Sequence, residues 1–437
     1  MKVLAAAIVP LVLAGAAAQA SPLLAGIKGQ VEAIAPAAEA LYVDLHRNPE
    51  LGFQEVETAK KLASRVRALG YDVTTGVGGT GVVALLRNGP GPTVMLRAEM
   101  DALPIQEKTG LAYASRAVAK DAAGREVPVM HACGHDLHMA AWYGTAAMMA
   151  QNRAHWSGTL MLVGQPAEET LRGARAMLKD GLFTRFPKPD YALSLHDDPY
   201  LVAGKVGYRA GPFRAAVDTV EITIFGRGGH GAAPHELRDP IVLAARTVLA
   251  LQTLVSRETD PFDAVVITIG SINGGSSPNV VPDEVKLQAT VRTLKEDVRR
   301  RVLAGIAREV KGIALAANMP REPQVAVTPG AGSFANDAKL VTRAVAAMRE
   351  VLDPDDVTEM TGRMASDDFM YFHEAGVKAL LLHFGAVDAS SLEQARKTGV
   401  PHPIPHSPLW APVYKPALRA AIMAETAVLL DLLRPAR

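Results

Sequence analysis

The sequence predicts an α/β fold with a mostly parallel sheet, helices on both of its faces and a smaller inserted α+β domain. In the first half of the chain, short and almost wholly apolar segments alternate with helical patterns, as expected for strands buried on both faces. Between residues 213 and 328, apolar and polar residues instead alternate one by one, which is typical of a sheet with one wet face. The first pattern returns after Pro329. We therefore predict one domain from residues 21–212 and 329–437, and an inserted domain at 213–328.

The elements of the larger domain follow from periodicity and from helix-ending residues. Two helices are predicted first, and Pro49 and Gly70 end them. The predicted helices are residues 27–47, 55–69, 136–151, 172–180, 336–352 and 412–433. The predicted strands are residues 81–87, 93–98, 158–164, 191–195 and 379–384. Strands that alternate with helices in this way imply parallel pairing.

The inserted domain has the order of a ferredoxin-like sandwich. Its first strand places Val220, Ile222 and Ile224 on one face and polar residues on the other. Asp239-Pro240 then provides a cap and a first residue for a helix. The remaining strands are predicted at 264–270, 285–293 and 324–328, with a second helix that ends near residue 317. This βαββαβ order predicts a small α+β sandwich.

Composition excludes several classes of protein. Of the 437 residues, 49% are hydrophobic and 21% are charged, so the chain can bury a sizeable core and is not disordered. The formal net charge of +1 provides no basic field for nucleic acid or for an anionic membrane surface.

The N-terminus has the pattern of a signal peptide. Lys2 precedes an apolar run over residues 3–17, and Ala18-Gln19-Ala20 is a small-x-small cleavage site. A membrane anchor is the alternative, but the run is short for a span. We expect cleavage after Ala20 and a periplasmic or secreted protein with no membrane contact thereafter. Since the chain has one cysteine, no internal disulfide can stabilise it.

That cysteine lies in the run with the most chemical information. Cys133 is two residues from His135 at a glycine turn, so a thiolate and an imidazole can converge on one ion. Glu168-Glu169 and His196 follow later strands, at the sheet edge where side chains converge. His406 adds a distant imidazole. The set can hold two divalent cations that share the thiolate, with zinc, manganese, cobalt and nickel all compatible.

The adjacent glutamates leave one carboxylate free for catalysis. One of them can bind metal while the other takes the proton of a metal-bridging water and later delivers it to a leaving amine. We assign Glu169 to the metal and Glu168 to the base, although the residues alone do not fix that order.

Other interpretations use fewer of these residues. A buried Cys133 can be an apolar filler, and a cysteine nucleophile with His131 or His135 as its base is conceivable. Both leave the two glutamates and His196 without a role. A metal-dependent binding protein without activity would not need Glu168.

Four motifs together resemble the metal-dependent amidohydrolases of the aminoacylase and carboxypeptidase family, within it the subgroup of hippurate hydrolase and the plant auxin-amino-acid conjugate hydrolases. They are LRAEMDALPI at 96–105, MHACGHDLHMA at 130–140, GQPAEE at 164–169 and GRGGHGAAPH at 226–235. The resemblance implies metal ligands and a base at the positions already selected. The implied ligands are Cys133, His135, Glu169, His196 and His406, with His402 as a rival for the last.

The resemblance adds three further roles. Asp101 would orient a ligand or the base Glu168. His230, in a glycine-rich turn of the inserted domain, would stabilise the oxyanion in its own or the partner's site. Asn279 would bind substrate. The inserted domain would act as a lid and pair edge to edge in a homodimer.

The implied reaction is hydrolysis of an N-acyl amino acid to a carboxylic acid and a free amino acid. The alternative is a metallo-dipeptidase or carboxypeptidase that acts on short peptides with the same site. The chain departs from the family pattern at Glu99, at Asp197-Asp198 and in the segment Ala365-Ser366-Asp367-Asp368. These positions bear on the substrate more than on the chemistry.

Overall fold

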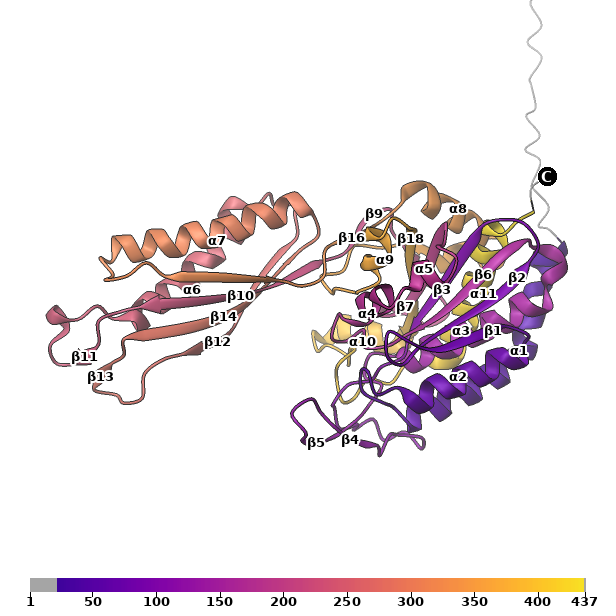
Figure 1. Cartoon of the computed structure of the whole chain (residues 1–437), viewed down its shortest axis with the longest axis horizontal. Coiled ribbons are helices and arrows are strands. Elements are labelled where there is room, and N and C mark those ends of the chain that lie inside the picture. Colours follow the sequence, from indigo (N-terminus) through magenta and orange to yellow (C-terminus); the bar gives the residue numbers. More distant parts are fainter. Residues whose placement is uncertain (1–21, 436–437) are drawn as a thin grey trace, which may run out of the picture.

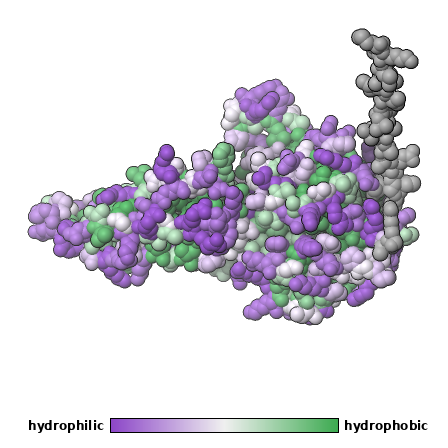
Figure 2. Space-filling model, turned by 90° about the horizontal axis from the view of Figure 1, so that it is seen from above, coloured by the Kyte–Doolittle hydropathy of each residue, from purple (hydrophilic) through white to green (hydrophobic). Residues whose placement is uncertain are grey.

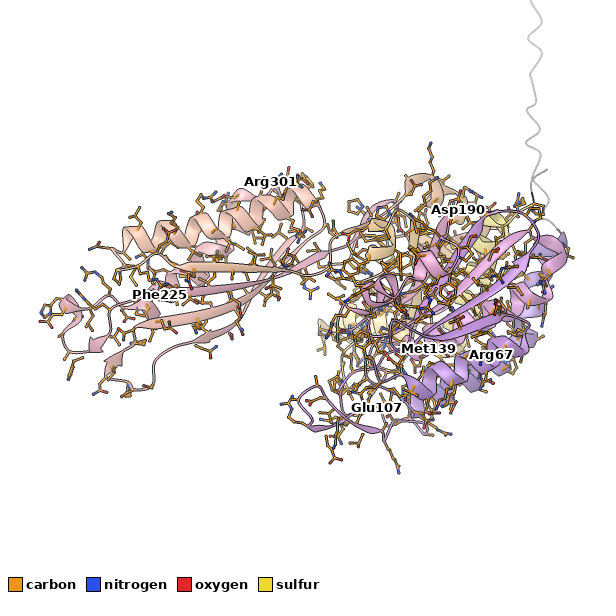
Figure 3. The ribbon with its side chains drawn as sticks, viewed as in Figure 1. Arg67, Glu107, Met139, Asp190, Phe225 and Arg301 are labelled. Atoms are coloured by element: carbon orange, nitrogen blue, oxygen red, sulfur yellow. The ribbon has the colours of Figure 1, made fainter. Side chains whose placement is uncertain are left out.

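The computed structural model describes residues 22–435. Figure 1 shows two lobes, a large one built around an eight-stranded sheet and an elongated one that projects from it. We call them the large lobe and the inserted lobe, the latter running from β10 to β15. Figure 3 shows the same separation, with Phe225 and Arg301 in the inserted lobe and Met139 inside the large lobe.

The sheet of the large lobe is mixed but parallel at its centre. Its strands, in spatial order, are β1 (Asp72–Val77), β2 (Gly81–Asn88), β6 (Gly158–Gln165), β3 (Thr93–Glu99), β7 (Tyr191–Val202), β18 (Lys378–Val387), β8 (Val206–Tyr208) and β17 (Val357–Glu359). β6, β3, β7 and β18 run parallel, whereas β1 and β2 pair antiparallel at one edge. The predicted fold class is confirmed.

Helices cover both faces of this sheet. Along β2, Val82, Ala84 and Leu86 join one apolar cluster, while Val83 and Leu85 join another, which is why the strand is apolar without interruption from Val82 to Leu86. The first cluster packs under α1 (Pro22–Arg47), α2 (Val56–Ala68), α3 (His135–Gln151), α8 (Ala338–Met348) and α11 (Tyr414–Leu432). The second packs under α4 (Gly173–Lys179), α5 (Leu182–Arg185) and α9 (Met370–Glu374).

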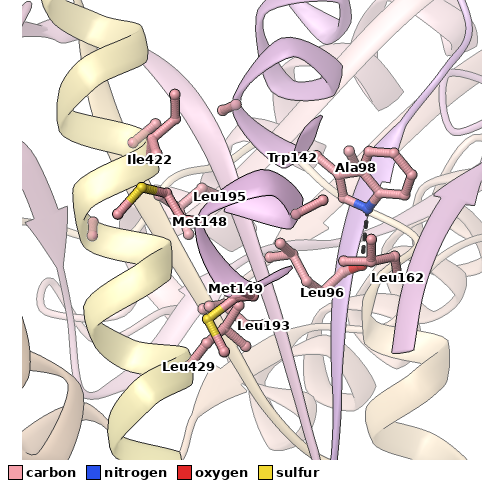
Figure 4. Close-up of a cluster of buried hydrophobic side chains, with 14 of the residues drawn as sticks. Leu96, Ala98, Trp142, Met148, Met149, Leu162, Leu193, Leu195, Ile422 and Leu429 are labelled. Carbon is pink, nitrogen blue, oxygen red and sulfur yellow. Dashed lines mark hydrogen bonds between the residues drawn. The ribbon is translucent and has the colours of Figure 1, made fainter. Parts of the chain in front are cut away.

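The first cluster fixes α3, the helix that begins at the site. Figure 4 shows Trp142 of α3 packed against β3, where its indole Nε1 donates a hydrogen bond of 3.2 Å to the carbonyl of Leu96. On the other side, Met148 packs near Ile422 of α11. A rigid, buried α3 holds its first turn at a fixed place above the sheet.

The inserted lobe has the predicted βαββαβ order. Its antiparallel sheet has the order β12 (Val265–Asn273), β14 (Glu284–Thr293), β10 (Ala216–Phe225) and β15 (Gln324–Pro329). One face packs on α6 (Pro240–Glu258) and α7 (Glu296–Ala316), and the Asp239 side chain caps α6 by accepting from the amides of Ile241 and Val242. β12 is an edge strand.

Several shorter elements complete the chain. They are β4 (Val118–Lys120), β5 (Glu126–Pro128), β9 (Gly211–Arg214), β11 (Gly229–His230), β13 (Val280–Val281), β16 (Phe334–Asn336) and α10 (Ala389–Thr398). The sequence did not predict them, since each is too short to show a period.

Several predicted boundaries were wrong. α1 begins at Pro22 rather than at residue 27, and β18 ends at Val387 rather than at residue 384. β7 does not end at Leu195 but continues to Val202, because its register with β18 carries on through His196 and Asp197. The helix predicted at 336–352 begins at Ala338, after β16, where the Asp337 side chain caps it by accepting from the amide of Leu340, and it ends at Met348. The predicted signal peptide, residues 1–20, lies outside the described residues. No helix within residues 22–435 is long and apolar enough to cross a membrane.

Candidate metal centre

The candidate residues converge at the carboxyl end of the central parallel strands. Asp101 follows β3, and Glu168 and Glu169 follow β6. His196 lies on β7 beyond Ser194, the last residue of β7 that pairs with β3. The start of α3 brings Cys133 and His135 to the same edge, where a loop before α11 adds His406.

Two groups of potential ligand atoms share the thiol, and a third contains His135, Glu168 and Glu169 without it. One atom from each of Cys133, His135 and His196 lies within 4.8 Å of the others, and so does one from each of Cys133, Glu169 and His406. Cys133 Sγ lies 3.7 Å from His196 Nε2, and His406 Nε2 lies 3.3 Å from a carboxylate oxygen of Glu169. A sulfur common to two groups is the arrangement that two ions with one bridging thiolate require.

Unpartnered buried atoms show that this donor set fits a cation. His135 Nδ1 donates to the backbone carbonyl of Asp101 at 2.8 Å. The lone pair of His135 Nε2 is therefore free to bind a cation. That Nε2 and Glu169 Oε1 are buried and have no hydrogen-bond partner in the described residues. Asp101 Oδ2 accepts from the amide of Glu169 at 3.0 Å and so orders both groups. Buried acceptors without a hydrogen-bond partner cost free energy of folding unless a cation binds them.

The pKa values of the two adjacent glutamates shift in opposite directions. Burial raises the pKa of Glu168 well above its usual range, and the carboxylates of Asp367 and Glu169 raise it further. Glu169 has a lowered pKa in spite of burial, because it pairs with His406 and lies near His135. Environments that separate the pKa values of two carboxyl groups are typical of sites where one acts as acid or base. Glu168 Oε2 lies 3.9 Å from His135 Nε2, at the edge of the ligand set.

His402 and His406 were the two candidates for the last metal ligand, and they lie in different surroundings. His402 Nε2 donates to the carbonyl of Pro199 at 2.5 Å, and His402 belongs to neither ligand group. His406 has a positive φ of 68°, a left-handed conformation that turns its ring towards Glu169. The structure therefore brings His406, and not His402, to the cluster.

His230 and Asn279 lie elsewhere. They are neighbours, because His230 of β11 pairs with Val280 of β13, directly after Asn279. Figure 1 shows β11 and β13 at the far tip of the inserted lobe. Neither residue lines the cavity beside Cys133. Within one chain, the structure does not bring them to Glu168.

A buried polar network, which the sequence analysis did not predict, lies beside the ligand cluster. Arg97 on β3 pairs with Asp367 at 3.0 Å, with Asp368 at 2.9 Å and with Glu99. His138 connects this network to the ligands, since Nδ1 lies 2.9 Å from Glu99 and Nε2 lies 3.3 Å from Asp197. An arginine in the middle of an apolar strand was the signal available in the sequence. Glu99, Asp367 and Asp368, three of the positions noted as departures, belong to this network.

A cavity of about 550 Å³ opens beside the ligand cluster. Cys133, Glu168, His406 and His383 are among the residues that line it. His383 is otherwise buried. The volume suits a small molecule of the size of an amino acid derivative.

Comparison with known proteins assigns this arrangement to a family. Residues 95–398 match the description Peptidase family M20/M25/M40. The chain belongs to this family. It is 38% identical to hippurate hydrolase from Campylobacter jejuni over 339 residues, which cover 77% of this chain and 85% of that protein. It is 36% identical to an IAA-amino acid hydrolase from Arabidopsis thaliana over 334 residues, 76% of this chain and 72% of that one.

A solved structure from the family has the same fold. It is described as a dinuclear metal binding peptidase of the M20 family from Bacillus subtilis, with a TM-score of 0.75 and 28% identity over 92% of this chain and 99% of that one. The predictions of the family and of a metal-dependent hydrolase acting on amide bonds are therefore confirmed. As a member of the M20 family, the chain shares its scaffold with enzymes that act on acylated amino acids.

Proposed function

We propose that this M20 family enzyme hydrolyses N-acyl amino acids to a carboxylic acid and a free amino acid, with Glu168 as general base. The observation that carries the proposal is the position of Glu168. It is a buried carboxyl beside two ligand groups, with its pKa raised, and it belongs to neither of the groups that contain Cys133. The relatives named for hippurate and for IAA-amino acid conjugates support this substrate class.

Two divalent cations fit the donor set, held by Cys133, His135, Glu169, His196 and His406. The neighbouring structure described as dinuclear supports that number. Thiolate and imidazole ligands favour zinc, and the carboxylate is compatible with manganese; cobalt and nickel suit the same set. When bound, the cations polarise the scissile carbonyl and lower the pKa of water.

The protein groups move the proton and fix the geometry. Glu168 takes a proton from the water as its oxygen bonds to the carbonyl carbon, and delivers that proton to the amide nitrogen as the C–N bond breaks. The products are a carboxylic acid and an amine, and the acid then gives its proton to the amine or to solvent. Asp101 holds the imidazole of His135 through its backbone carbonyl and the amide of Glu169 through its side chain.

A substrate panel tests the reaction. We expect the metal-loaded enzyme to hydrolyse N-acyl amino acids with a kcat/KM at least about 10-fold above that for dipeptides of the same amino acid, a difference of about 1.4 kcal/mol in transition-state binding. Release of the free amino acid is the measurement. If dipeptides are better substrates, the enzyme is a dipeptidase or carboxypeptidase with the same site, and the proposal is wrong.

We also propose that the inserted lobe pairs with a second copy, so that His230 serves the partner's site. The support is an uncovered apolar surface. Ile241, Val242 and Leu249 of α6 are exposed, as are Val266 and Ile272 of the edge strand β12. Figure 2 shows apolar side chains among polar ones on the inserted lobe.

Subunit mixing tests the position of His230. Glu168→Ala and His230→Ala should each be nearly inactive, and unfolding and refolding the two together should restore part of the activity, because a mixed dimer contains one site with both residues. Light scattering would report the mass of a dimer. A monomeric enzyme, or mixtures no more active than their components, would exclude the proposal.

Export is proposed on the strength of residues 1–20 alone. N-terminal sequencing of the protein from its native source should begin at Ser21. A retained Met1 would contradict cleavage.

A further inference from the structure

Three arginines line the cavity beside the ligand cluster, namely Arg214, Arg292 and Arg363. Their charges are compensated to different degrees. Arg363 Nε and Nη2 each lie 2.9 Å from a carboxylate oxygen of Asp198, which is a two-pronged ion pair. Asp198 Oδ2 also accepts from His383 Nδ1 at 2.8 Å. The Asp198 carboxylate is thus used by both Arg363 and His383.

Arg214 lacks such a partner. It ends β9, its residue is only 4% exposed, and its Nε and Nη2 have no hydrogen-bond partner within residues 22–435. His383 cannot offset this charge, because an imidazole is either neutral or positively charged. Leaving a buried guanidinium unpaired is costly, so such a group in a cavity wall indicates a site for an anion.

Arg292 adds a second charge from the inserted lobe. It lies on β14, and its Nη1 donates to the backbone carbonyl of Met364 at 3.0 Å. A carbonyl satisfies one donor but does not offset the charge. Within residues 22–435, Arg214 and Arg292 are therefore two guanidinium groups that line one cavity without a carboxylate partner.

A substrate with one carboxylate would compensate only one of these charges. We propose that the substrate of this enzyme carries a second carboxylate and that Arg214 binds it, which makes Arg214 the residue that determines specificity. The inference rests on the proposed function and narrows it to amides with two carboxylates. Arginine suits the task, because its planar fork matches both oxygens of a carboxylate.

The second carboxylate can belong to either half of the amide. An acidic amino acid such as aspartate or glutamate would carry it on the product amine, and a succinyl-type acyl group would carry it on the product acid. The chemistry at Arg214 is the same in both cases. The two sources are separated by substrate choice.

The test compares substrates on the metal-loaded enzyme and its variants. The substrates are N-acetyl-L-glutamate, N-acetyl-L-aspartate, N-succinyl-L-alanine and, with one carboxylate, N-acetyl-L-methionine. We expect kcat/KM for at least one of the first three to exceed that of N-acetyl-L-methionine by at least about 10-fold. Arg214→Met should lower that value by about 100-fold, mainly through KM, as expected when a buried charge pair loses one partner.

Controls separate recognition from structure. Arg214→Met should change kcat/KM for N-acetyl-L-methionine by less than about 3-fold, and Arg214→Lys should recover part of the lost activity. Arg300→Met, which removes an exposed arginine of α7, should leave all four substrates unaffected. Equal losses on all substrates would mean that Arg214 only supports the fold, and the proposal would be wrong.

A binding measurement distinguishes failure of this inference from failure of the proposed function. By calorimetry, glutarate should bind the metal-loaded enzyme at least about 10-fold more tightly than butyrate, and Arg214→Met should abolish the difference. Neither compound has an amide, so the result does not depend on hydrolysis. Equal binding of glutarate and butyrate would overturn the inference even if N-acyl amino acids are cleaved. Preferential glutarate binding without cleavage of any amide would contradict only the proposed function.

Discussion

Replacing Glu168 with glutamine should reduce kcat by about 10²- to 10⁴-fold, the contribution that a positioned general base makes. Glutamine keeps the shape of the side chain but cannot accept a proton. Because Glu168 belongs to neither ligand group around Cys133, two cations should remain bound per chain. KM should change little, since the lost interaction is made mainly in the transition state. Rates on an N-acyl amino acid and elemental analysis of the purified variant are the measurements.

The neighbouring glutamate provides the matched comparison. Glu169→Gln should lose metal as well as activity, since the Glu169 carboxylate lies 3.3 Å from His406 Nε2 and within the second ligand group. Glu57→Gln, on the exposed face of α2, should match the parent enzyme. If Glu168→Gln loses metal and Glu169→Gln retains it, the two roles are exchanged. If Glu168→Gln keeps more than about a tenth of the turnover, another group is the base.

The sequence could predict the scaffold because the scaffold is periodic. Where a strand such as β2 is buried on both faces, its residues must be apolar, and in strands such as β10 apolar and polar residues must alternate. Both sheets could therefore be predicted from the sequence. The position of the two glutamates at the site could be predicted for a different reason. They follow a strand directly, and strand ends place side chains at the same edge of a sheet.

Contacts between distant segments could not be predicted in this way. Asp197-Asp198 resembles a loop, yet the pair lies within β7, because His138 and Arg363 compensate the two charges from elsewhere in the chain. The pairing of Arg97 with Asp367 and Asp368 joins residues about 270 positions apart. Arg214 is harder still, since its importance lies in the absence of a partner, and no pattern in a sequence shows which charge is unpaired.

Cys133→Ala should remove both cations rather than one. Its sulfur is common to the group with His135 and His196 and to the group with Glu169 and His406, so no complete set of ligands remains for either ion. The loss in metal affinity should exceed the about 10- to 100-fold that is typical when only an outer hydrogen bond to a ligand is removed. Metal content below one ion per chain, together with undetectable hydrolysis, is the expected result. Alanine is smaller than cysteine and therefore fits the buried position of Cys133. Circular dichroism should accordingly show the parent fold.

Chelation of the parent enzyme separates this role from nucleophilic catalysis. If Cys133 binds metal, a chelator should abolish hydrolysis, and added zinc or manganese should restore it. While the ions are bound, a thiol-alkylating reagent should act slowly, because bound metal withdraws the thiolate lone pairs from reaction. A cysteine nucleophile predicts the opposite on each count: Cys133→Ala would keep its metal, chelation would be harmless and alkylation would inactivate at once. The high pKa that burial imposes on the Cys133 thiol argues against that alternative, since a thiol held protonated is a poor nucleophile until a cation displaces its proton.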